Sequence, residues 1–208
     1  SMISNDDILV LYSAGTGGEF LTGLISRTVD DINTLTPTEV GPNHWNLACK
    51  RTYVDVYNAN PEKFPDGIDS GYRGETDKPI NIYKDHLVDV DILADYWYND
   101  MTVIALGLPG HYQYWAEITW KKLHTVNITT DKKTFIKNHA ADLKHRYNIL
   151  QDYKKRFTNF NVINIGSQHF MPLIISKQLQ SIAQLSNMNK KKFHEEHMKW
   201  IEKNNGLR

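Results

Sequence analysis

A glycine cluster near the amino terminus, Gly15-Thr16-Gly17-Gly18, has the residue types that bind an anion through backbone groups. It follows a run of apolar residues at 8–12 and precedes apolar residues with helical spacing. A strand, a glycine-rich turn and a helix in this order form an anion site, because successive N–H groups converge and the helix dipole adds positive potential. We therefore expect this turn to hold a phosphate-like group.

The turn does not match the two common nucleotide-binding patterns. A nucleoside-triphosphate P-loop, G-x-x-x-x-G-K-[ST], needs a lysine for the outer phosphates and a hydroxyl for magnesium. Glu19 and Phe20 stand at these two positions, which argues against an ordinary ATPase or GTPase. The dinucleotide pattern G-x-G-x-x-G is also poorly met, since Gly17 is followed by Glu19 two places later and the next glycine is Gly23. A tight turn that binds nothing stays an alternative, because glycines also serve plain turns.

Lys84 and His86 form a second candidate site at the end of an apolar segment that is typical of a strand. Residues two apart on a strand share one face, so the two side chains are expected to lie together. The imidazole titrates near neutrality when unperturbed, which suits a general base that takes a proton from an alcohol. A histidine at a strand end can also be structural or simply exposed, and both interpretations stay open.

These two segments together resemble sulfotransferases. The glycine turn with the following Phe20-Leu21 resembles the family's phosphosulfate-binding loop, in which a strand leads into a small-residue turn, an aromatic residue and a leucine. The KDHL segment at 84–87 resembles the family's Lys-Thr-His-Leu segment at the end of a later strand. The resemblance covers residues 8–30 and 80–123. It implies a P-loop NTPase-like, sulfotransferase-like fold that uses 3′-phosphoadenylyl sulfate, with His86 as the base and Lys84 stabilising the departing phosphate.

The chain departs from this family at several positions. The family often carries a lysine or arginine just before its Ser-Gly, whereas Ser13 and Ala14 stand here. An arginine and a serine hold the donor's 3′ phosphate in the family, and the corresponding stretch VIALGLPGHYQYW contains neither. We expect His111, or a lysine at 121–122, to substitute. The family's carboxyl-terminal Arg-Lys-Gly segment is also absent.

Further residues are candidates for the acceptor site. Tyr112 begins an aromatic-rich helical segment beside the expected site, and His44 lies in a long irregular excursion at about 33–78. Long irregular excursions in compact domains are often functional. Sulfuryl transfer relies on positioning and electrostatic stabilisation, so we expect no metal. His194 and His197 are three residues apart instead of the four of H-E-x-x-H, and we expect His197 on a packed helix face.

The predicted elements alternate along the chain. Apolar runs predict strands near 8–12, 80–83, 102–106 and 160–165, and helical spacing predicts helices near 20–31, 112–123, 132–156, 172–185 and 189–203. This succession predicts an α/β domain of three layers, with a mostly parallel sheet and flanking helices. Sheets of this kind bind ligands at the carboxyl ends of their strands. We expect residues 2–208 to form one domain.

The composition limits the function classes. Acidic and basic residues balance at 24 each, so no global positive field indicates a nucleic-acid partner. The apolar runs are too short to cross a bilayer, so no membrane partner is expected. The single cysteine, Cys49, cannot form an internal disulfide and no secretory leader precedes it, which indicates the cytoplasm. No motif indicates an oligomeric state.

The residues and the resemblance together predict an enzyme of the transferase class. The expected reaction moves a sulfuryl group from 3′-phosphoadenylyl sulfate to a hydroxyl or amine on a small-molecule or carbohydrate acceptor. Two alternatives stay open. One is a P-loop-like nucleotide-dependent kinase, for which Glu19 in place of lysine is unfavourable. The other is a non-catalytic binding or assembly module on the same fold.

Overall fold

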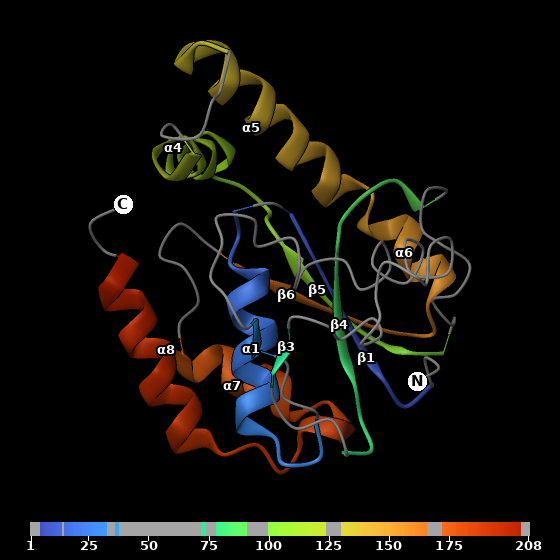
Figure 1. Ribbon diagram of the computed structural model, residues 1–208. Helices are drawn as coiled ribbons and strands as arrows, with labels where there is room; N and C mark the ends of the chain where they lie inside the picture. The colour runs from blue at the N-terminus through green and yellow to red at the C-terminus, as the bar shows by residue number, and fades with distance from the viewer. Residues whose placement is uncertain are drawn as a thin grey trace, which may run out of the picture.

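The structure is a computed structural model that describes residues 5–13, 15–32, 36–37, 72–73, 78–90, 100–123, 130–165 and 172–204. These residues form an α/β protein (Figure 1). The sheet consists of β1 (Ile8–Tyr12), β4 (Ile82–His86), β5 (Thr102–Gly107) and β6 (Asn159–Asn164). All pairings in this sheet are parallel and the spatial order is β4-β1-β5-β6, so the expected parallel α/β architecture is confirmed.

The helices connect these strands and complete the chain. They are α1 (Gly18–Thr28), α4 (Tyr112–Leu123), α5 (Lys132–Asn148), α6 (Leu150–Arg156), α7 (Pro172–Gln180), the 3₁₀ turn η3 (Ala183–Leu185) and α8 (Lys190–Asn204). The single helix expected over 132–156 is two helices, because the backbone tightens at Ile149 and its N–H bonds to the carbonyls of both His145 and Tyr147. Two short strands, β2 (Thr36–Pro37) and β3 (Tyr72–Arg73), pair antiparallel.

Strand β1 lies at the centre of the fold. Its residues from Ile8 to Leu11 are fully buried, because β4 and β5 flank the strand and helices cover both faces. Ile8 and Val10 pack with apolar residues of α1, α7 and α8, while Leu9 and Leu11 pack with those of α6. Figure 1 shows the same division, with α1, α7 and α8 on one side of the sheet and α6 on the other. Burial on both faces explains why this strand is a continuous apolar run.

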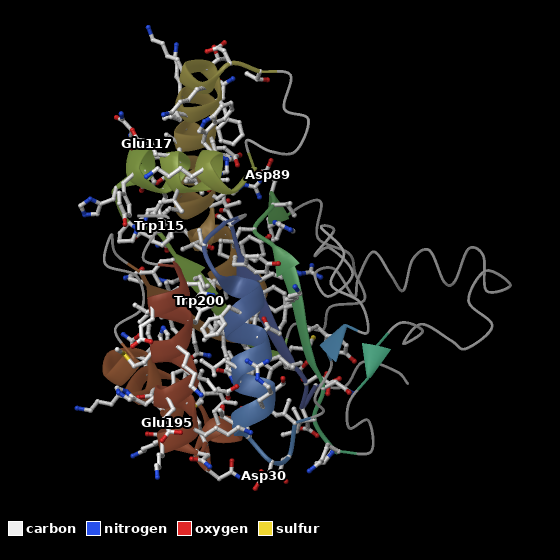
Figure 2. The ribbon with its side chains drawn as sticks, turned by 60° about the vertical axis from the view of Figure 1, so that its left-hand side comes forward. Asp30, Asp89, Trp115, Glu117, Glu195 and Trp200 are labelled. Atoms are coloured by element: carbon white, nitrogen blue, oxygen red, sulfur yellow. The ribbon has the colours of Figure 1, made fainter. Side chains whose placement is uncertain are left out.

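The strand order predicts a ligand-binding position next to β1. From β1 the chain adds β4 on one side and then crosses to add β5 on the other. In open α/β sheets, ligands bind outside the carboxyl ends of the strands where the order reverses in this way. Figure 2 shows this edge at the top of the molecule, marked by Asp89 after β4 and Trp115 in α4, whereas Asp30 after α1 lies at the opposite end. The glycine turn after β1 lies at this edge.

Most of the expected excursion at about 33–78 lies outside the described residues, and the expectation of one domain over 2–208 stays a prediction. Within the part of the chain that the structure describes, no helix is both long and apolar enough to span a bilayer.

Two glycines of α1 provide a matched test of this packing. A Cβ at Gly18 would overlap the ring of Tyr12, whereas a Cβ at Gly23 would lie 2.8 Å from the guanidinium of Arg27, the far end of a partly exposed side chain that pairs with Glu196. We expect Gly18→Ala to lower the free energy of unfolding by about 1–3 kcal/mol through overpacking. Gly23→Ala should raise it by up to about 1 kcal/mol, because alanine favours helix. Urea titrations of both variants measure these changes, and equal effects would contradict the described contact of α1 with β1.

Candidate functional site

The glycine turn lies between β1 and α1, where the sequence predicted it. Gly15 and Gly17 have φ angles of 81° and 84°, which side chains rarely adopt. Gly17 is the residue that precedes α1, and it provides no side chain to cap the helix. The first turn of α1 therefore presents backbone N–H groups that Gly17 leaves uncapped. This is the arrangement in which a helix N-terminus binds an oxyanion.

The polar groups of Thr16 form hydrogen bonds within the turn, whereas a ligand-binding residue would direct them to the ligand. Its N–H donates to the carbonyl of Ser13 at 3.2 Å, and its hydroxyl donates to the same carbonyl at 2.6 Å. The side chain is buried within the turn. Thr16 thus braces the turn internally, and the amides available for an anion are those of the first turn of α1. A direct contact of Thr16 with a phosphate stays a prediction.

Tyr12, the last residue of β1, connects the glycine turn with the second predicted site. Its ring packs against the backbone of Gly18 so closely that a side chain there has no room. The centroid of the same ring lies 5.1 Å from that of His86. The ammonium of Lys84 lies 6.0 Å from the Tyr12 centroid, at the outer limit of a cation–π contact. Sequence analysis did not single out Tyr12, and the available signal was an aromatic residue directly before a glycine turn.

The parallel register explains why these side chains meet. Lys84 pairs with Val10 and His86 pairs with Tyr12, so both project from β4 on the side of the sheet that α1 covers. Lys84 is only 1% exposed, whereas His86 is half-buried and open to solvent in part. A buried ammonium is costly unless charges or hydrogen bonds compensate it. Lys84 lies buried beside Tyr12, close to the glycine turn.

The chain directly after His86 is fixed from the other side of the sheet. The guanidinium of Arg146 donates to the carbonyl of Leu87, and the hydroxyl of Tyr153 donates to that of Val88 at 2.5 Å. The imidazole of His145 lies 3.0 Å from the carboxylate of Asp89. These contacts come from α5 and α6, which follow His86 by about sixty residues in the chain. They restrict the backbone that carries the candidate base.

Helix α4 packs against the same turn. A Cβ at Gly15 would lie 2.5 Å from the hydroxyl of Thr119, so the turn and α4 are in close contact. His111 precedes α4 and accepts the N–H of Trp115 at 3.1 Å through its carbonyl. Its φ angle is 58°, which makes it the non-glycine residue with left-handed backbone among the described residues. The side chain of His111 is exposed, and its contact with a ligand stays a prediction.

The structure describes one of the two predicted acceptor residues. Tyr112 is partly buried at the start of α4, and burial raises its phenol pKa, with Tyr147 of α5 as a smaller cause. Tyr112 packs against the apolar cluster that includes Leu21 of α1 and Trp115 of α4, and its contact with an acceptor stays a prediction. His44 lies outside the described residues, so its role stays a prediction.

An aromatic cluster holds α8 against the first turn of α1. Phe20 stacks on Trp200 with 4.5 Å between centroids, and His197 lies 5.8 Å from both Phe20 and Phe193. Figure 2 shows Trp200 on α8 beside α1. The packed face expected for α8 is confirmed, since Phe193 and His197 are fully buried. The cluster fixes the amino-terminal end of α1, where the sequence predicts the anion site.

Comparison with known proteins adds no family. A scan of the chain against protein-family models finds no match, and a search of curated proteins finds none either. The functional argument therefore depends on the geometry of this site.

The free energy of unfolding should depend on pH, because His197 is buried in the aromatic cluster. Burial lowers the pKa of His197 to about 4, and His194 is a smaller cause. An unfolded histidine titrates near 6.5, so between about pH 6.5 and pH 4 the unfolded chain binds more protons than the folded one. The free energy of unfolding should fall by up to about 3 kcal/mol as pH decreases through this window. Urea titrations at several pH values measure the slope.

His197→Phe should remove most of this slope, and His194→Gln should leave most of it because burial is the larger cause. His139, whose pKa burial also lowers, should account for a smaller remaining slope in both variants. An unchanged slope in His197→Phe would contradict a neutral, buried imidazole between α1 and α8.

Proposed function

We propose that this chain is a sulfotransferase, of the P-loop NTPase-like class, that moves a sulfuryl group from 3′-phosphoadenylyl sulfate to a hydroxyl or amine acceptor. The observation that carries the proposal is the contact of Tyr12 with three groups at once: the glycine turn, Lys84 and His86. An anion site, a cation and a candidate base thereby meet at the carboxyl edge of the sheet. These are the groups that sulfuryl transfer requires from a protein.

Each group has a distinct task in this reaction. The uncapped amides at the start of α1 bind the 5′ phosphosulfate of the donor. His86 takes the proton of the acceptor hydroxyl while the acceptor oxygen forms a bond to sulfur. The bond between sulfur and the phosphate oxygen breaks, and adenosine 3′,5′-bisphosphate leaves with the electron pair. Lys84 stabilises the negative charge that develops on the departing phosphate.

One observation favours a ligand site over a plain turn. His111 keeps a left-handed backbone that costs a non-glycine residue about 1–2 kcal/mol. Strain of this kind concentrates at functional sites, and His111 lies at the switch point of the sheet. We assign it to the donor's 3′ phosphate, where the family has arginine and serine.

The assignment of His86 and Lys84 leads to different expectations for the two variants. His86→Gln should lower turnover by about 10² to 10⁴ and leave the affinity for adenosine 3′,5′-bisphosphate nearly intact, because a base acts in the transition state. Lys84→Met should lower both turnover and nucleotide affinity, since a cation near the phosphate acts in both states. Single-turnover kinetics and isothermal titration calorimetry measure the two quantities separately.

Exposed residues provide matched controls for these variants. His194→Gln and Lys144→Met remove the same groups from the surfaces of α8 and α5, and neither should change turnover. Thermal unfolding establishes that every variant is folded. Equal turnover by the wild type and His86→Gln, with the chemical step rate-limiting, would rule out His86 as the base.

A further inference from the structure

A groove between α4 and α5 has the size of a small-molecule site and is separate from the contacts of Tyr12. Its volume is about 550 Å³, within the range of sites that bind metabolites. It opens beside the start of α4, two residues after His111. The lining consists of Gln113, Lys132, Lys133, Ile136, Lys137 and Ala140.

The three lysines of the groove lie near the amino-terminal end of α5, where the helix dipole already contributes partial positive charge. Lys132 and Lys133 lie in the first turn of α5, and Lys137 lies one turn later. None of the three forms an ion pair with a residue that the structure describes. The first turn of α5 contains no acidic residue, and cations near a helix N-terminus are unfavourable. Such a departure from local preference is expected at functional positions.

Neighbouring acidic groups do not neutralise the lysines directly. The carboxylate of Asp131, which precedes α5, accepts both the N–H and the hydroxyl of Thr134, at 3.0 Å and 2.7 Å. Glu117 of α4 accepts the side-chain amide of Gln113 at 3.4 Å. The three lysines therefore outnumber these two carboxylates, and they form no ion pair with either of them.

Aromatic packing holds the groove in shape. Phe135 of α5 packs against Trp120 of α4 with 5.3 Å between centroids, and His139 stacks on Phe135 one turn later. These contacts fix the rotation of α5 about its axis. Ile136 and Ala140, each one position further along the helix, consequently form an apolar lining between the lysines. The stems of the lysines extend this apolar surface.

We propose that this groove binds a small amphiphilic anion, a molecule with a flat apolar body and a carboxylate, sulfonate or phosphate group. The lysines bind the anionic group, and Ile136 and Ala140 contact the apolar body. The amide of Gln113 orients a polar substituent. This site goes beyond the proposed sulfuryl transfer, and its ligand binds whether or not that reaction takes place.

Fluorescence titration with 2-naphthol-6-sulfonate tests the proposal, with neutral 2-naphthol as the matched ligand. The sulfonate should bind more tightly than 2-naphthol, and added salt should weaken its binding. The triple variant Lys132→Gln, Lys133→Gln, Lys137→Gln should lose about tenfold or more in affinity for the sulfonate, since several charge contacts are lost together. Affinity for 2-naphthol should remain within about twofold.

A second triple variant removes the same charge elsewhere. Lys144→Gln, Lys190→Gln, Lys191→Gln changes exposed lysines of α5 and α8 and should bind the sulfonate like the wild type. Thermal unfolding establishes that both variants are folded. Three results would each overturn the proposal. The two triple variants could bind the sulfonate equally well, or the wild type could bind 2-naphthol as tightly as its sulfonate. The wild type could also bind the polyanion heparin without binding the sulfonate.

Discussion

The contact between the ring of Tyr12 and the backbone of Gly18 is the constraint on which the rest of the site depends. It leaves no space for a side chain at the first residue of α1, and so fixes how the helix leaves the sheet. The same ring provides the surface that His86 and Lys84 approach. A single aromatic residue thus contacts the candidate anion site, Lys84 and His86 together. Catalysis by positioning requires this kind of fixed geometry.

The surrounding layers support this centre from three directions. The aromatic cluster of α8 packs on Phe20 in the first turn of α1, and Thr119 of α4 packs against Gly15. On the other side of the sheet, Arg146 and Tyr153 hold the carbonyls that follow His86. The site residues therefore lie on strand ends and helix starts whose backbones are restrained from several elements. Sites with such support hold the geometry of their residues more accurately than sites on isolated loops.

Much of the fold could be predicted from the sequence because its signals are local. Strands β1 and β5 are the buried runs that parallel packing favours, and period-two alternation places Lys84 and His86 of β4 on one face. The break at Ile149 had no such signal, since no glycine or proline marks it. Two contacts depend on packing that no local pattern encodes: Tyr12 with Gly18 across the turn, and Arg146 with Leu87. The internal bonds of Thr16 are local, yet glycine spacing alone does not reveal them.

The central claim is that the first turn of α1 binds the phosphosulfate of the donor. Amide NMR spectra recorded during titration with adenosine 3′,5′-bisphosphate test it most directly, with the variant Gly17→Val as the comparison. The account predicts that the largest shifts occur at the amides of Gly17, Gly18 and Phe20, and that Gly17→Val abolishes them because valine at φ 84° is strained and blocks approach to the backbone. Saturating nucleotide that leaves these amides unshifted, or shifts that persist unchanged in Gly17→Val, would contradict the account.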